Sequence, residues 1–180
     1  MPRLKVVDPK TAMGETKEIF ETILRGKHLN IFKGMANSPT ALNGYLALKG
    51  TLDTGTLSEI EREIIALVIA ERNECDYCLA AHTAAGKRAG LSMDETLSIR
   101  GGKHDDPRIQ ALIDFTEAIH AKKGFVSDGD VEDFLAAGYD EGHVVEVVAN
   151  VALNFFTNYF NHINDTEVDL PAAPDFVGQR

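Results

Sequence analysis

Residues 58–74 constrain the fold of this chain more than any other segment. Ser58 is followed three residues later by Glu61, the capping-box pattern that marks the start of a helix. Residues 64–70, in the middle of the segment, are apolar without interruption. A helix that is apolar on every side belongs in the centre of a fold. By composition the run could also be a buried strand, but its polar, helix-forming flanks favour a helix.

Helix signals continue along almost the whole chain. Ser38 and Pro39 suit the N-cap and the first turn of a helix, and Gly90 suits the end of one. The other expected helices show apolar residues at helical spacing or a clear start and stop. Together they cover residues 11–29, 38–52, 58–74, 75–89, 92–100, a helix opening at 105–107, 127–137 and 140–164. No strand pattern is convincing, so we predict an all-α fold.

The length of 180 residues favours one domain. We expect it to span residues 1–180, with an N-terminal lead over residues 1–10 and a C-terminal strap over residues 165–180. Hydrophobic residues make up 44% of the chain and charged residues 26%, which is enough apolar surface for a real core. Disorder is therefore not expected over most of the length.

The charge of the chain restricts its partners. A formal net charge of −10 argues against nucleic acid or an anionic membrane, because both need a basic surface. The first nine residues lack the apolar stretch of a signal peptide, and the longest apolar run is far shorter than the ~20 residues of a membrane helix. We therefore expect a cytoplasmic protein, whose thiols are kept reduced.

The only two cysteines, Cys75 and Cys78, lie three residues apart, and His82 follows four residues later. A disulfide between them would close a very small loop and stabilise the fold little, so the pair is expected to do chemistry. It can cycle between dithiol and disulfide, or it can hold a metal. If Cys75 lies at the start of a helix, the free N–H groups and positive partial charge there favour a thiolate, the form that attacks a peroxide or a disulfide.

A possible base, Glu63, lies twelve residues before Cys75 on the expected central helix. A short turn near residues 73–74 would let the two helices pack antiparallel. Whether Glu63 then reaches the cysteines depends on that turn, which the sequence leaves open. If it does, Glu63 and His82 could carry a proton to and from sulfur.

Three other interpretations of the pair remain open. Cys75, Cys78, His82 and Glu63 have the donor types of a zinc site, although a structural zinc site usually recruits a second C-x-x-C or a distant histidine pair. The cysteines could be two small buried residues. They could also belong to a redox-sensing protein with little turnover. A thioredoxin-like site is disfavoured, because no strand precedes Cys75.

The spacing Glu63, eleven residues, Cys75-x-x-Cys78-x-x-x-His82 resembles that of the AhpD-like (alkylhydroperoxidase D-like) proteins of the carboxymuconolactone decarboxylase superfamily. The flanking residues 57–63 and 80–86 are similar to that family as well. Residues 154–161 resemble the final helix of its peroxidase-related branch. The resemblance covers roughly residues 7–171.

This resemblance implies an AhpD-like helical fold, with the C-x-x-C at the N-terminus of a central helix, assembled into trimers or hexamers. It implies a peroxidase cycle with no haem or metal cofactor. Cys78 would be the peroxidatic sulfur, Cys75 the resolving sulfur, and Glu63 and His82 the proton relay. The substrate would be a hydroperoxide, and the reductant a dithiol such as a lipoyl group on a carrier protein.

Tyr77 departs from this family pattern, because the best-studied branch has a histidine immediately before the second cysteine. A tyrosine can donate a hydrogen bond but does not act as a base near neutral pH, given a reference pKa of about 10. The relay is therefore expected to differ here.

Two further groups of residues have uncertain roles in the sequence. The aromatic residues at 155, 156, 159 and 160 either pack in the core or a subunit interface, or line a pocket over the cysteines. The remaining histidines have no matching partners in the sequence, and we interpret them as surface or structural residues; they are His28, His104, His120, His143 and His162.

Overall fold

The structure is a computed structural model and describes residues 1–175, in which helices are the only regular secondary structure. The prediction of an all-α fold is therefore confirmed for this part of the chain. In order, the elements are α1 (Gly14–Glu18), the π-helix η1 (Ile19–Ile23), α2 (Asn30–Met35), α3 (Pro39–Leu52), α4 (Glu59–Arg72), α5 (Asp76–Ala89), α6 (Met93–Arg100), α7 (Pro107–Ala121), α8 (Asp128–Ala136) and α9 (Glu141–Asn164).

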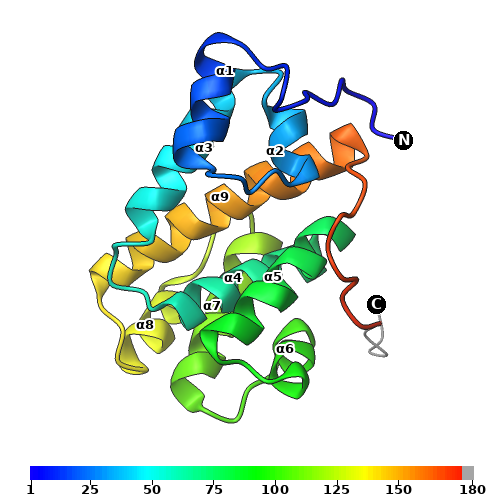
Figure 1. The fold of residues 1–180 in the computed structure, drawn as a ribbon. Helices are drawn as coiled ribbons and strands as arrows, with labels where there is room; N and C mark the ends of the chain where they lie inside the picture. Colours follow the sequence, from blue (N-terminus) through cyan, green and yellow to red (C-terminus); the bar gives the residue numbers. More distant parts are fainter. Residues whose placement is uncertain (176–180) are drawn as a thin grey trace.

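The long helix α9 crosses the molecule between two groups of helices, α1–α3 on one side and α4–α8 on the other (Figure 1). Helix α4 packs against α5, α6, α7 and α9. Its apolar stretch, residues 64–70, is at most 2% exposed at every position. The prediction of a central helix that is covered on all sides is confirmed.

Most helices begin where the sequence predicts, because a side chain satisfies the free N–H groups of the first turn. Capping boxes occur at Ser58, Ser92, Ser127 and Asp140. Ser38 accepts a hydrogen bond from the backbone N–H of Ala41, with Pro39 in the first turn. These caps are local features, so the sequence reveals them without knowledge of the packing.

The expected single helix over residues 11–29 is wrong. Helix α1 has one turn of α-helix, continues as η1, and stops before Arg25 and Gly26, which both have positive φ values of 45° and 87°. The left-handed backbone at these two residues reverses the chain. A separate helix, α2, then begins at Asn30. Apolar spacing extends across the break because both pieces bury their apolar sides against the same cluster.

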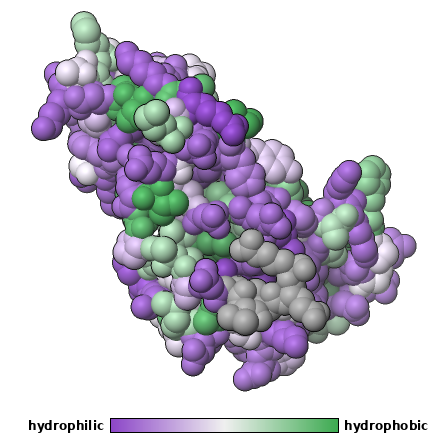
Figure 2. All heavy atoms as spheres, turned by 90° about the vertical axis from the view of Figure 1, so that its right-hand side faces the viewer, coloured by the Kyte–Doolittle hydropathy of each residue, from purple (hydrophilic) through white to green (hydrophobic). Residues whose placement is uncertain are grey.

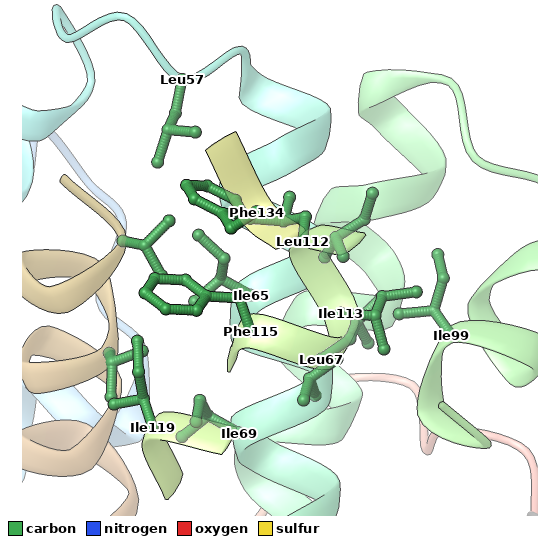
Figure 3. Packing of buried hydrophobic residues seen from close by; sticks show 14 of the residues in the cluster. Leu57, Ile65, Leu67, Ile69, Ile99, Leu112, Ile113, Phe115, Ile119 and Phe134 are labelled. Atoms are coloured by element: carbon green, nitrogen blue, oxygen red, sulfur yellow. The ribbon is translucent and has the colours of Figure 1, made fainter. Parts of the chain in front are cut away.

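Buried apolar side chains form two clusters. The first surrounds α4 and includes residues of α6, α7, α8 and α9, among them Ile65, Leu112 and Phe134 (Figure 3). The second joins η1, α2 and α3 to the start of α5, and it contains Cys75 and Cys78. The cysteines therefore lie inside the fold, where the N-terminal helices meet the α4–α5 pair.

A buried ion pair ties α6 to α4. The Arg100 guanidinium lies 2.7 Å from the Glu71 carboxylate, and the two side chains are 2% and 5% exposed. Arg100 also donates to the carbonyl of Pro174 in the C-terminal tail, at 2.8 Å. These contacts hold three segments together that are far apart in the sequence.

Beyond α9, residues 166–175 run without a helix along one side of the molecule (Figure 1). Residues 176–180 of the expected strap lie outside the described residues. The face on this side carries mainly hydrophilic residues, with hydrophobic ones in small separate areas (Figure 2). None of the helices in residues 1–175 has both the length and the apolar character needed to cross a membrane.

Candidate active site

The N-terminus of α5 positions the two cysteines. Cys75 is the N-cap residue, and its Sγ accepts a hydrogen bond from the backbone N–H of Cys78 at 3.4 Å. A tight turn precedes it, in which Glu74 has a φ of 54° and the Cys75 N–H donates to the carbonyl of Ala70. The predicted position of the pair at a helix start is confirmed. Both residues are free thiols, and they are only 1% and 2% exposed.

Two asparagines of α9 lie against the sulfurs. The side-chain amide of Asn161 donates to Cys78 Sγ at 3.2 Å and lies 3.9 Å from Cys75 Sγ. Asn158 is fully buried, and its amide group also lowers the pKa of Cys78. Sequence reasoning missed both residues. A signal was present, because the asparagines at 150, 154, 158, 161 and 164 recur at helical spacing on a helix that is otherwise rich in apolar residues.

The two thiols titrate as one unit. A hydrogen bond from Cys78 lowers the pKa of Cys75, helped by the Cys78 backbone N–H, Asn161 and the charge of His82, and these outweigh its burial. The hydrogen bond to Cys75, burial and the charge of Cys75 raise the pKa of Cys78. The pair therefore gives up its first proton more readily than a free thiol does and holds the second more strongly.

Glu63 and His82 meet across the antiparallel α4–α5 pair. The Nδ1 atom of His82 lies 2.8 Å from Oε2 of Glu63, and both side chains are partly exposed, at 26% and 18%. Within residues 1–175, the groups that hydrogen-bond the sulfurs come from the cysteine pair itself and from α9, and neither Glu63 nor His82 is among them. The structure thus brings the two predicted relay residues into contact with each other, but neither of them hydrogen-bonds a sulfur.

A cavity of about 330 Å³ opens next to the Glu63–His82 pair. Its wall also includes Tyr45, Ala66 and Thr157, from α3, α4 and α9. Burial and the charge of Cys78 raise the pKa of Tyr45, which keeps its hydroxyl protonated. Sequence reasoning missed Tyr45, because nothing in the α3 sequence marks it as a site residue.

Three of the charged residues that line this cavity pair with one another. Asp53 lies 2.7 Å from the ammonium of Lys49 and 3.6 Å from the guanidinium of Arg62. Charges that are paired in this way attract a charged ligand only weakly. The cavity therefore suits a small, neutral, partly polar molecule.

Tyr77 points away from the cavity. Its hydroxyl donates to Oδ1 of Asp169 at 2.8 Å and accepts a hydrogen bond from the backbone N–H of Ile31 at 3.3 Å. The same carboxylate accepts from the backbone N–H of Asn30. Burial raises the pKa of Tyr77. The residue that departs from the family pattern thus ties α5 to α2 and to the C-terminal tail, and it takes no part in a relay.

The zinc alternative gains no support from the geometry. Among residues 1–175, no three side chains of histidine, cysteine, aspartate or glutamate converge as metal ligands do. Glu63 and His82 contact each other, and the sulfurs face the asparagines of α9. The four predicted residues therefore form two pairs rather than one tetrahedral set.

The aromatic residues of α9 divide between the two roles considered. Phe155 and Phe160 pack against the two apolar clusters, whereas Phe156 and Tyr159 are 41% and 52% exposed. Phe156 also contacts the ring of Tyr45, the residue in the cavity wall, with ring centres 6.3 Å apart. Core packing and surface exposure thus account for most of this stretch.

The family comparison places the site within a known sequence pattern. Residues 39–119 match the model of the carboxymuconolactone decarboxylase family. This range runs from α3 into α7 and contains Glu63, Cys75, Cys78 and His82. Helix α9, with its asparagines, lies outside it. No protein of curated function matches the chain.

Several solved structures share the fold. An alkylhydroperoxidase AhpD core protein from Ralstonia eutropha JMP134, described as peroxidase-related, has a TM-score of 0.83 at 21% identity, covering 93% of this chain and 92% of its own. A peroxidase-related protein from Silicibacter sp. TM1040 has a TM-score of 0.80 at 23% identity, covering 98% and 93%. The debrominase Bmp8, in complex with 2,3,4-tribromopyrrole, has a TM-score of 0.77 at 16% identity and covers 94% of each chain.

Proposed function

We propose that this chain is an AhpD-like protein of the carboxymuconolactone decarboxylase superfamily and a thiol-dependent peroxidase that reduces hydroperoxides, because residues 39–119 match that family's model and the fold is shared with peroxidase-related proteins. One observation carries the proposal. Two buried free thiols, one with a lowered pKa, lie at the start of the helix that carries His82, and the Glu63–His82 pair lines a cavity. The cysteine pair has both a nucleophilic thiolate and a second sulfur within reach to form a disulfide.

The proposed cycle uses both sulfurs. The proton of Cys78 first passes to Cys75, and the resulting Cys78 thiolate attacks the outer oxygen of a hydroperoxide. The O–O bond breaks, and the alkoxide leaves as an alcohol after it takes up that proton, which leaves Cys75 as a thiolate. Cys78 is then a sulfenic acid. The Cys75 thiolate attacks that sulfur, the S–O bond breaks, and water leaves after a further proton transfer. The product is a Cys75–Cys78 disulfide, and an external dithiol supplies the two electrons and two protons that restore the thiols.

We assign the proton transfers to Glu63 and His82. They lie in the cavity wall, 2.8 Å from each other, where a substrate oxygen would be released. Glutamate and histidine are common proton donors and acceptors in enzymes. The charge of His82 also helps to lower the pKa of Cys75, after the hydrogen bond from Cys78 and the other local groups.

The partners of this reaction are part of the proposal. The oxidising substrate is a small hydroperoxide, in agreement with the size and the neutral character of the cavity. The reductant is a dithiol, with a lipoylated carrier protein as the first candidate, and the protein works in the cytoplasm.

We also propose that the chain forms homo-oligomers, as trimers or hexamers, through an apolar stripe on α9. The stripe consists of Val145, Val148, Tyr159 and Ile163, which are 49–68% exposed. They recur at helical spacing along one side of the longest helix, so they can meet another subunit together.

Stopped-flow mixing of the fully reduced protein with cumene hydroperoxide tests the main proposal. We expect two thiols to be lost per peroxide consumed, a disulfide as the product, and no disulfide in Cys78→Ser. Turnover with dihydrolipoamide would distinguish an enzyme from a redox sensor, which would form the disulfide once without a cycle.

Two parallel measurements separate the alternatives. Stoichiometric zinc in the purified protein, bound by the cysteines, would favour a structural metal module. Loss of bromide from 2,3,4-tribromopyrrole without peroxide reduction would favour the chemistry named for the debrominase among the structural neighbours.

A further inference from the structure

A row of asparagines on α9 faces the interior of the protein. Asn150, Asn154, Asn158, Asn161 and Asn164 are each at most 5% exposed. Asparagine is seldom buried without partners, because its amide group loses hydrogen bonds to water. Asn150 and Asn154 satisfy their amide N–H groups with carbonyls of the preceding turn of α9. Asn158 and Asn161 differ from them, since their side chains extend towards the cysteine pair.

Asn161 makes the direct contact with Cys78. Its Nδ2 lies 3.2 Å from Cys78 Sγ, while its Oδ1 has no hydrogen-bond partner. Leaving a buried amide oxygen without a partner costs free energy. A hydrogen bond from the amide N–H to a negatively charged sulfur is strong enough to offset this cost, so the orientation of Asn161 favours a thiolate at Cys78.

Asn158 is oriented by a chain of hydrogen bonds that begins at His120 of α7. Nε2 of His120 lies 2.9 Å from Oδ1 of Asn73, and Nδ2 of Asn73 donates to Oδ1 of Asn158 at 3.0 Å. The Nδ2 atom of Asn158 is buried and has no hydrogen-bond partner, and the Asn158 amide lowers the pKa of Cys78. Because Asn73 occupies its oxygen, Asn158 has only N–H groups left to offer to a nearby sulfur.

These hydrogen bonds give a role to His120, which the sequence alone led us to interpret as a surface or structural residue. For Asn73 Oδ1 to accept from His120, the Nε2 atom of His120 has to carry a proton. Burial, followed by the charge of Arg72, lowers the pKa of His120, which favours the neutral ring near pH 7. The ring also stacks on Phe155, with ring centres 5.5 Å apart, and this contact holds it in place.

We propose that Asn158 and Asn161 form an amide cradle that stabilises negative charge on the sulfur of Cys78, and that His120 and Asn73 are positioning residues that orient the Asn158 amide. The inference rests on the dithiol chemistry proposed above and extends it. The backbone N–H of Cys78 favours charge on Cys75, the other sulfur of the pair. The cradle opposes this bias, because the Asn161 amide lies closer to Cys78 Sγ (3.2 Å) than to Cys75 Sγ (3.9 Å), and it stabilises charge on the sulfur to which we assign the attack on peroxide.

Other titratable groups surround Cys78, and the test has to separate them from the cradle. They are Cys75 and Tyr77 on the same turn, His82 one turn further on, Tyr45 of α3 and, beyond His82, Glu63 of α4. Each of these remains unchanged in the asparagine variants below, apart from Cys75, which is removed deliberately.

The test measures the pKa of Cys78 alone, in a Cys75→Ser background, from the pH dependence of alkylation by iodoacetamide. Asn161→Leu, which has nearly the same shape, should raise this pKa by about one unit, so that alkylation below the pKa is about tenfold slower. Asn161→Asp should raise it further, because a carboxylate replaces the donor. Asn158→Leu should also raise it.

Asn164→Leu is the matched control. Asn164 is equally buried on the same helix, but its side chain bonds Thr166 and the backbone N–H of Leu4. It should lower stability without moving the pKa of Cys78. An unchanged or lowered pKa in both Asn158→Leu and Asn161→Leu would overturn the cradle. If Asn161→Leu does not fold, the pKa of Cys78 in Asn161→Asp and Asn158→Leu still decides whether the cradle exists.

Two variants of His120 test the hydrogen bonds that orient the Asn158 amide. His120→Phe keeps a ring against Phe155 but removes the donor, and we expect it to raise the pKa of Cys78 part of the way to the value of Asn158→Leu. His120→Gln supplies an amide N–H to Asn73 and should restore a value near that of the Cys75→Ser parent. Equal pKa values in these two variants would contradict the role of His120. None of these measurements uses a peroxide, so they can fail or succeed independently of the proposed enzyme activity.

Discussion

The Nδ1 atom of His82 lies 2.8 Å from the Oε2 atom of Glu63, although the two residues are nineteen positions apart in the sequence. The tight turn at Glu74 makes this contact possible, because it folds α5 back along α4. A carboxylate that accepts from one nitrogen of an imidazole fixes the tautomer and orients the other nitrogen. The pair is therefore built to present Nε2 of His82 to whatever occupies the adjacent cavity.

Replacing Glu63 by glutamine should impair peroxide reduction without unfolding the protein. The amide can still hydrogen-bond His82, but it neither takes up a proton nor stabilises the imidazolium. We expect kcat/KM for cumene hydroperoxide to fall roughly a hundredfold, the lower end of what a proton relay contributes. Steady-state turnover with dihydrolipoamide measures it.

Glu132→Gln is the control for this variant, since Glu132 is an exposed residue of α8, a helix that contributes no residue to the cavity wall. It should leave kcat/KM unchanged. Equal activities of wild type and Glu63→Gln would remove Glu63 from the relay.

As the pH rises, the first thiolate of the reduced protein should form at a much lower pH than the second. The lowered pKa of Cys75 means that its thiolate appears at a lower pH than that of a free cysteine, about 8.5, and the raised pKa of Cys78 delays the second deprotonation. Thiolate absorbance at 240 nm, followed from about pH 4 to pH 10, should therefore show a single step that begins below about pH 8.5. Two equal steps near that pH would be inconsistent with this coupling of the two thiols.

Tyr77→Phe should weaken the fold but spare the thiol chemistry. It removes the hydrogen bonds to Asp169 and from the backbone N–H of Ile31, which together contribute about 1–2 kcal/mol. Urea unfolding should show a loss of that size, with little change in the thiolate titration. Tyr159→Phe, at a side chain that is half exposed, should have no measurable effect on stability. A large shift of the thiolate titration in Tyr77→Phe would instead assign Tyr77 to the site.

Glu71→Gln should be strongly destabilising. It removes the Glu71 carboxylate charge from the Arg100 guanidinium, which is only 2% exposed, and breaking a buried pair in this way costs about 3–5 kcal/mol. Glu21→Gln breaks the exposed pair with Lys17 and should cost less than about 0.5 kcal/mol. Comparable unfolding free energies for the two variants, measured in urea, would contradict this ranking.

The apolar stripe of α9 should mediate self-association. Val148→Glu combined with Tyr159→Glu introduces two charges into a surface that would be buried between subunits, and charges without partners are costly there. Light scattering should give a multiple of 19.6 kDa for the wild type and a single-chain mass for the double variant. Met13→Glu, at an exposed apolar residue elsewhere, should leave the mass unchanged. A monomeric wild type would end the proposal of an oligomer.

Much of the fold could be predicted from the sequence, because its signals are local. Capping residues such as Ser58 and Asp140 lie within three residues of the N–H groups that they bind, so helix starts are visible without packing. The one wrong helix, over residues 11–29, fails at Arg25, where a non-glycine residue adopts a left-handed conformation that the sequence does not mark.

The sequence by itself determined that helices predominate, that residues 64–70 form a buried centre, and which four residues form the candidate site. Only the tertiary structure decided how these residues are paired, that Tyr77 faces the tail, and that Asn161 and Asn158 face sulfur. Contacts of the last kind join α5 to α9 across more than eighty residues. Their partners are set by the rotation and depth at which two helices pack, and no local pattern of residues encodes that geometry.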